Sequence, residues 1–129
     1  MDKLCSFRRK VTLFGFYFAS LDIRQDSRVI SRALDAVIEE NSSLFSGLND
    51  LSEAEQVDKL LNISGSVELP SSDDEVVLDT VGSFSLIDEI QTLNGEQGCH
   101  RYIISNCHGP IDMARGMPFS SFVAGRTNP

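Results

Sequence analysis

Arg24 is the residue of this sequence whose type and position best suit the binding of an anion. It comes directly after an apolar run, residues 16–23, that predicts a buried strand, and functional residues of parallel barrels lie where strands end. Its planar guanidinium can donate two parallel hydrogen bonds to a phosphate or a carboxylate. The alternative is an internal ion pair with Asp22 or Asp26, and the position of Arg24 alone leaves both interpretations open.

A second buried strand is predicted over residues 102–105, whose sequence YIIS is short and β-prone. The same rule about strand ends adds Asp22 and Gln25 at the first strand and Ser105 and Asn106 at the second. Two strands separated by helices indicate parallel pairing within a larger barrel or sheet. Because parallel strands are normally covered on both faces and flanked at both edges, the chain resembles a slice of a larger fold.

Two Cys-His pairs, Cys99-His100 and Cys107-His108, raise the question of a zinc site. Adjacent residues in an extended segment point to opposite faces, so each pair is poorly arranged to bind one ion. No glycine-rich phosphate loop, nucleophile elbow or H-E-x-x-H motif is present in the sequence. We therefore expect the cysteines to pack as small apolar residues, neither metal ligands nor nucleophiles.

Helices are predicted to position these residues. Apolar residues at spacings of three and four predict an opening helix over residues 4–14, which Gly15 ends, and a longer helix over residues 29–38. Pro110 is typical of the first residue of a last helix. The predicted order is helix, strand, three helices, strand, helix.

Two S-x-x-E patterns predict where the middle helices begin. Ser52 with Glu55 and Ser72 with Glu75 match the capping box, in which two side chains satisfy the first free N–H groups of a helix. The second of these helices continues through apolar positions and is predicted to end at Asn94-Gly95.

Composition limits the classes of function. The length of 129 residues predicts one domain or part of one. The chain is 41% hydrophobic and 23% charged, as is typical of globular proteins. The net charge of −8 argues against a nucleic-acid partner, because such binding depends on basic side chains that release counterions. No apolar run approaches the ~18 residues of a membrane span, so no membrane partner is expected.

The three cysteines, an odd and sparse set, favour a reducing compartment. Residues 11–21 (VTLFGFYFASL) follow Arg8-Arg9-Lys10 and have the charge and length of a secretory signal. They lack an A-x-A cleavage site. Secretion therefore stays the minor alternative to a cytoplasmic location.

One block of sequence resembles a known family. Residues 19–28 (ASLDIRQDSR), which follow Phe14-Gly15, resemble phosphoenolpyruvate carboxylase, in which F-G followed by L-D-I-R-Q-[DE]-S is characteristic. Shorter matches to the family's later helices and strand are residues 51–53 (LSE), 77–80 (VLDT) and 101–106 (RYIISN), and Asp112 matches the aspartate of a family S-x-x-D-[VL] position. The resemblance covers about residues 1–115.

The resemblance implies a carbon-carbon lyase that joins phosphoenolpyruvate to bicarbonate, giving oxaloacetate and phosphate, with Mg²⁺ or Mn²⁺. It implies that Arg24 is a catalytic residue that contacts the substrate phosphate, that Gln25 belongs to the same substrate-binding site, and that Gln25 and Asp22 orient Arg24. It further implies a fold that is mostly α with two short parallel strands, a slice of a helix-rich α/β barrel of the TIM type. Full-length members are expected to be homo-oligomers, which leaves the state of this chain open.

Other parts of the family pattern are missing from the sequence. These are an upstream histidine motif and downstream metal-binding carboxylates and glycine-arginine loops, so we expect the chain alone to bind no metal and to be inactive. Residues 116–129 (GMPFSSFVAGRTNP) leave the pattern where family members continue an apolar helix. We therefore expect a partial barrel segment over residues 1–115 and a divergent, disordered tail over 116–129, produced by truncation or a shifted reading frame.

A second hypothesis comes from a different class of protein. A small acidic helical chain can also act as a binding or structural module without catalysis, which docks on a partner through exposed strand edges and uncovered apolar stripes. The sequence alone does not decide between this module and a segment of a carboxylase.

Overall fold

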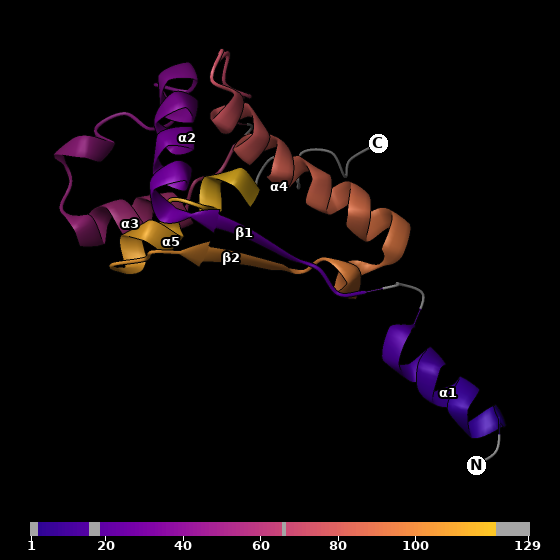
Figure 1. The fold of residues 1–129 in the computed structure, drawn as a ribbon. Coiled ribbons are helices and arrows are strands. Elements are labelled where there is room, and N and C mark those ends of the chain that lie inside the picture. Colours follow the sequence, from indigo (N-terminus) through magenta and orange to yellow (C-terminus); the bar gives the residue numbers. More distant parts are fainter. Residues whose placement is uncertain (1–2, 16–18, 66, 121–129) are drawn as a thin grey trace.

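A computed structural model describes residues 3–15, 19–65 and 67–120 of the chain. It contains a two-stranded parallel sheet and several helices in the predicted order (Figure 1). The helices are α1 (Lys3–Phe14), α2 (Ser27–Glu40), α3 (Glu53–Leu61), α4 (Glu75–Asn94) and α5 (Pro110–Ala114), with 3₁₀ turns at Leu48–Asp50, Glu96–Gly98 and Met117–Phe119. The prediction of a mostly helical chain with two short parallel strands is confirmed.

The sheet pairs β1 (Asp22–Asp26) with β2 (Arg101–Ser105) in parallel, with Arg24 opposite Ile103. The prediction of a first strand over residues 16–23 is wrong at its start, because residues 19–21 are not in a strand; residues 16–18 lie outside the described part. The strand begins where a partner is available, at the position paired with the first residue of β2.

Both strands are half-buried, whereas the sequence predicted buried ones. Exposed and half-buried side chains alternate along β2, and the half-buried Tyr102 and Ile104 pack against the core. Figure 1 shows α2 and α4 on one side of the sheet. The alternation and the helix layer together leave one face of the sheet covered and the other open.

Helix ends follow the predicted signals with one exception. Ser52 and Glu55 form the predicted capping box at α3. At α4 the prediction is wrong: Asp74, not Ser72, is the N-cap and accepts a hydrogen bond from the backbone N–H of Val76. The Ser72 hydroxyl instead accepts from the backbone N–H of Asp74, so it supports the residue that caps the helix.

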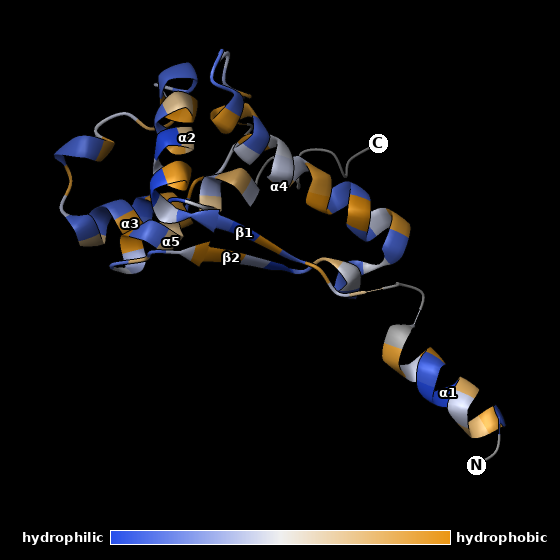
Figure 2. Cartoon of the chain, viewed as in Figure 1, coloured by the Kyte–Doolittle hydropathy of each residue, from blue (hydrophilic) through white to orange (hydrophobic). Residues whose placement is uncertain are grey.

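The core lies between the helices. α2 contributes one apolar stripe, and α4 lies across it (Figure 2). The core residues, all buried and apolar, are Ile30, Ala33, Leu34, Val37, Phe45, Leu48, Leu60, Val67, Val77, Val81, Phe84, Ala114 and Phe119. The apolar spacing that predicted the second helix therefore correctly identified its buried face.

The last described turn extends the fold past the predicted boundary at residue 116. Phe119 is fully buried, and its ring stacks on Phe84 with centroids 4.9 Å apart. Phe84 stacks in turn on Tyr102, at 4.2 Å. The three rings connect β2, α4 and the 3₁₀ turn, so the chain is folded as far as this turn; residues 121–129 of the predicted tail lie outside the described part.

Candidate anion site on the open face of the sheet

Arg24 lies in the middle of β1, not after its end as the sequence predicted. Its neighbours in the strand, Ile23 and Gln25, are half-buried, while Arg24 itself is exposed. Because side chains alternate between the two faces of a strand, Asp22, Arg24 and Asp26 share the open face. The guanidinium is thus directed away from the helices.

The two carboxylates beside Arg24 are bound to other arginines. Asp22 accepts a hydrogen bond from Nε of Arg101 at 2.6 Å, across the sheet. Asp26 accepts from Nε and Nη2 of Arg28 at 2.8 and 2.9 Å. Among the residues that the structure describes, none forms a hydrogen bond or ion pair with the side chain of Arg24. The structure therefore does not contain the internal ion pair that was the alternative reading of Arg24.

Gln25 lies on the opposite face of β1 from Arg24, against the helices. Its amide nitrogen donates to the Thr80 hydroxyl of α4 at 3.2 Å, and its amide oxygen accepts from the backbone N–H of Asp26 at 2.9 Å. Thr80 is buried and donates onward to the carbonyl of Val76 at 2.7 Å. Gln25 connects the sheet to α4, which fixes the strand that carries Arg24.

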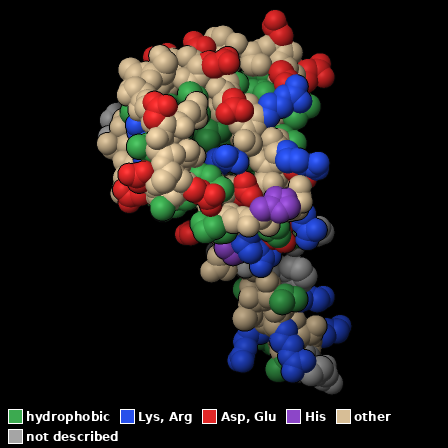
Figure 3. Space-filling model, turned by 90° about the vertical axis from the view of Figure 1, so that its left-hand side faces the viewer, with side chains coloured by type: hydrophobic (Ala, Val, Ile, Leu, Met, Phe, Trp, Pro, Cys, Tyr) green, Lys and Arg blue, Asp and Glu red, His purple; other side chains and the backbone are tan. Residues whose placement is uncertain are grey.

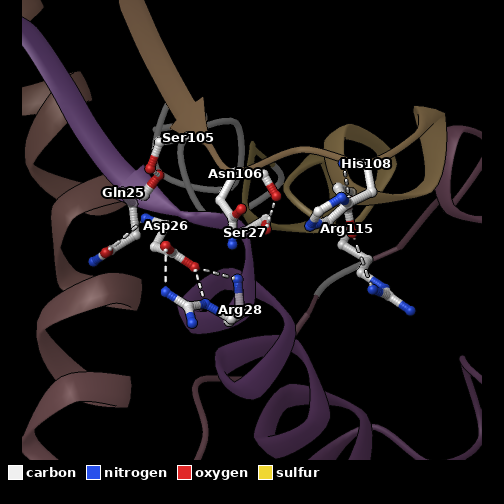
Figure 4. Close-up of polar contacts among 9 residues, drawn as sticks. Gln25, Asp26, Ser27, Arg28, Ser105, Asn106, His108 and Arg115 are labelled. Atoms are coloured by element: carbon white, nitrogen blue, oxygen red, sulfur yellow. Dashed lines mark hydrogen bonds and ion pairs between the residues drawn. The ribbon is translucent and has the colours of Figure 1, made fainter.

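The ends of the two strands meet, although Asp22, Gln25 and Ser105, which the sequence placed after the strands, lie within them. The hydroxyl of Ser27 donates to the backbone carbonyl of Asn106 at 2.7 Å, and that of Ser105 donates to the carbonyl of Gln25 at 3.3 Å (Figure 4). Asn106 has a positive φ of 58°, a conformation that asparagine tolerates better than most residues. This turn directs the chain from β2 into the segment before α5.

Asp26 begins α2 at this end of the sheet. Its carboxylate accepts from the backbone N–H of Arg28 at 2.9 Å as well as from the guanidinium of Arg28. These bonds to the Arg28 side chain, and then to its backbone, lower the pKa of Asp26 from 3.8 to about 2. Asp26 therefore stays ionised at neutral pH and paired with Arg28.

A polar hollow of about 290 Å³ lies beyond the end of β2, and sequence reasoning missed it. Its lining residues are Ser27, Arg28, Ser31, Arg32, Asp35, His108, Asp112 and Arg115. Arg32 is paired with Asp74, and Arg115 donates to Asp112 at 3.2 Å. Arg28 and Arg32 are four residues apart on α2 and predict a shared face, but no local signal predicts that Arg115 joins them. Since each arginine has a carboxylate partner, the charges in this hollow are balanced.

The side chains present do not fit a divalent metal. No group of three or more His, Cys, Asp or Glu in the described ranges could hold a metal ion. The carboxylates nearest Arg24 accept from arginines, and an ion such as Mg²⁺ would compete with those bonds for the same oxygens. The cysteines Cys5, Cys99 and Cys107 are free thiols, of which Cys99 alone is buried.

No helix in the described part of the chain is both long and apolar enough to cross a membrane.

Comparison with known proteins identifies the family. Residues 1–117 match the family described as phosphoenolpyruvate carboxylase. Enzymes of that name from Thermosynechococcus vestitus and Parasynechococcus marenigrum are 33% and 31% identical over 92% and 90% of this chain. The one from Nitrosomonas eutropha is 34% identical over 81%. The chain spans about 12% of the length of these relatives, and no solved structure matches it.

These matches confirm the resemblance seen in the L-D-I-R-Q block, and they include both strands and the helices between them. Together with the mostly helical fold and its parallel pair of strands, they show that the chain belongs to the phosphoenolpyruvate carboxylase family, of which it is a segment of the TIM-barrel-type core.

Proposed function

We propose that this chain supplies Arg24 as a phosphate-binding arginine for the carboxylation of phosphoenolpyruvate by bicarbonate. The observation that carries the proposal is the state of the guanidinium: it is exposed on the open face of β1, and no described residue pairs with it. Family membership supports the reaction class. The finer claim, that Arg24 contacts the substrate phosphate, rests on the L-D-I-R-Q match and on this geometry.

The carboxyl end of β1 is the relevant place, because the active sites of TIM-type barrels lie at that end of the strands, and Arg24 is two residues before it. In barrels of the TIM type the helices cover the outside of the strands, so the face turned away from them lines the interior. Arg24 lies on that face of β1, while Gln25 faces α4. A substrate phosphate above the open face would meet the guanidinium without displacing a helix.

The neighbouring ion pairs keep Arg24 available for an anion. If Asp22 or Asp26 were unpaired, either carboxylate would compete with phosphate for the guanidinium. Arg101 and Arg28 bind those two carboxylates instead. Arg24 can therefore donate two parallel hydrogen bonds to phosphate and stabilise the negative charge that develops as the phosphoryl group is transferred.

The chain is not expected to catalyse the reaction alone. Its described residues offer no ligand set for the divalent metal that the family uses, and one positioned arginine provides a small part of a complete site. In a coupled assay of the purified chain with phosphoenolpyruvate, bicarbonate and Mg²⁺, we expect no oxaloacetate. Metal-dependent oxaloacetate formation would show that the chain holds a complete site. A cytoplasmic location accompanies this proposal and is compatible with three free thiols.

A chimera tests the role of Arg24. The segment of the Thermosynechococcus vestitus enzyme that aligns with this chain is replaced by residues 1–117, and Arg24→Lys is compared with the parent. Lysine keeps the charge but loses the paired donors, so we expect kcat to fall by about 10²-fold and the melting temperature to stay unchanged. Arg32→Lys, in an exposed pair on α2, is the matched control and should leave kcat unchanged. Unchanged kinetics with a lower melting temperature for Arg24→Lys would remove Arg24 from the site.

The second hypothesis, a non-catalytic binding module, is favoured by a different observation. The described side chains of α1 are exposed, including several large apolar ones. This surface takes no part in the proposed site on the sheet.

A further inference from the structure

Asp22 lies beside two guanidinium groups on the open face of the sheet. It is two residues before Arg24 in β1, and the register of the sheet places it opposite Arg101, the first residue of β2. Side chains at i and i+2 of a strand share a face, so Asp22 and Arg24 lie on the same side of β1. The structure shows the Asp22 carboxylate bound to Nε of Arg101 at 2.6 Å.

The two carboxylates of this face are held with different strength. Asp26 accepts from Nε and Nη2 of Arg28 and from its backbone N–H, and these contacts lower its pKa from 3.8 to about 2. For Asp22 the described part of the chain provides one hydrogen bond, from Nε of Arg101. The side chains of Arg101 and Asp22 are 54% and 27% exposed, and water weakens such a pair. Asp22 is thus the carboxylate that can change partner.

A carboxylate can take the place of a phosphate at Arg24. A guanidinium donates the same two parallel hydrogen bonds to either group. Acidic residues outnumber basic ones in this chain, 19 against 11, and Figure 3 shows acidic side chains spread over the body of the molecule. If Arg101 were lost, Asp22 would be left without its partner on the face that carries Arg24.

We propose that Arg101 is a positioning residue of the candidate anion site: by binding Asp22, it prevents this carboxylate from occupying Arg24. The inference rests on the proposed phosphate-binding role of Arg24 and deepens it. It gives Asp22 a role opposite to the one that the family resemblance implies, since Asp22 competes for Arg24 and does not orient it. In this role Arg101 acts through Asp22 and need not contact the phosphate.

Arg28 does not have the same role at the other carboxylate. The backbone N–H of Arg28 donates to Asp26 at 2.9 Å, because Asp26 is the N-cap of α2. That bond forms whatever side chain residue 28 carries. Asp26 therefore keeps a partner at the start of α2, whereas Asp22 depends on the side chain of Arg101 alone among the described residues.

The competition predicts a particular change in kinetics. Without Arg101, Asp22 occupies Arg24 only in the free protein, because a bound phosphate displaces it. The apparent affinity for phosphate falls in proportion to the fraction of molecules in which Arg24 is free. For an ion pair as exposed as this one, the fall is about two- to sixfold. A complete enzyme should show it as a higher KM with unchanged kcat, since the lost binding is the same in the ground state and the transition state.

A change of partner can be observed in the full chain without any ligand. The side-chain Nε–Hε signal of Arg24, assigned by its absence in Arg24→Lys, is recorded by proton–nitrogen NMR in the parent, Arg101→Gln, Asp22→Asn and the double variant. We expect Arg101→Gln to shift this signal, because Asp22 then pairs with Arg24. The double variant should return it toward the parent position. A merely structural role of the ion pair predicts no such rescue.

The kinetic half of the test uses the chimera described above. Arg101→Gln should raise KM for phosphoenolpyruvate by about two- to sixfold at unchanged kcat, and Asp22→Asn in the same chain should restore KM. Arg32→Gln is the matched control, because it makes the same change at another exposed arginine, paired with Asp74. It should leave both KM and the Arg24 signal unchanged. Circular dichroism verifies that each variant keeps its helices.

The outcomes separate this inference from the proposed function. An Arg24 signal that is the same in the parent and in Arg101→Gln overturns the inference, as does a double variant that behaves like Arg101→Gln. A KM that Arg101→Gln leaves unchanged also overturns it, even where the signal shifts. If Arg24→Lys leaves kcat of the chimera unchanged, the proposed function fails instead, whichever partner Asp22 takes.

Discussion

Phe119→Ala tests whether the turn after α5 belongs to the fold. The side chain of Phe119 is fully buried and stacks on Phe84. Removing it deletes a large apolar group and leaves a cavity that the surrounding helices fill only in part, which costs about 3–5 kcal/mol. Part of this sum, about 0.5–1.5 kcal/mol, is the loss of the stacked pair.

The expected loss is large compared with the stability of a small domain. A chain of this size has a free energy of unfolding of about 5–15 kcal/mol, so Phe119→Ala should remove a fifth or more of it. Urea denaturation followed by circular dichroism measures the change as a shift of the midpoint at constant slope. Phe119→Leu, which keeps most of the apolar volume, should cost clearly less.

The control is Met117→Ala in the same 3₁₀ turn. Met117 is 45% exposed, and its truncation should change the free energy of unfolding by less than about 1 kcal/mol. A loss below about 1 kcal/mol for Phe119→Ala as well would show that the turn does not pack against α4 in solution, and the boundary near residue 116 would then stand. Such a result would refute the packing argument.

Two further predictions concern polar contacts. Asn41→Ala should lower the free energy of unfolding, measured in urea, by about 1–3 kcal/mol. The side-chain amide of Asn41 accepts from the backbone N–H of Glu68 at 2.8 Å and donates to its carbonyl at 3.0 Å, and the substitution leaves both groups unpaired. Asn62→Ala is the control and should cost less, because the Asn62 amide donates to the carbonyl of Asp58 within its own helix. Arg28→Ala should raise the pKa of Asp26 from about 2 toward 3.8 in a carboxylate NMR titration, since the Arg28 side chain is the largest cause of the shift. Because that pKa is depressed in the folded state, the contribution of Asp26 to stability is present above pH 3.8 and is lost as the pH falls through about 2; an unchanged titration in Arg28→Ala would contradict this assignment.

The family could be recognised from the sequence because its most specific block is continuous. Residues 19–28 contain Arg24 and both neighbouring carboxylates, and the match over residues 1–117 agrees with it. The block could not show which arginine binds each of the two carboxylates. Asp22 is bound by Arg101, which is 79 residues away in the sequence. The pairing of the two strands therefore decides that Asp22 binds Arg101 and not Arg24.

Helix positions were predictable because their causes are local. The backbone bonds of a helix join residues four apart, and its caps act within one turn. The apolar spacing in α2 and the Ser52–Glu55 box at α3 therefore predicted real elements. The cap of α4 departs from its local signal where a distant residue intervenes, because Asp74 also pairs with Arg32 of α2.

The sequence by itself thus determined the order of the elements, the buried face of α2 and the family to which the chain belongs. Tertiary structure decided where β1 begins, which face presents Arg24, and that Phe119 enters the core. The physical reason is distance along the chain: strand pairing and ring stacking join residues far apart in the sequence, and their energy depends on neighbours that only the folded chain brings together.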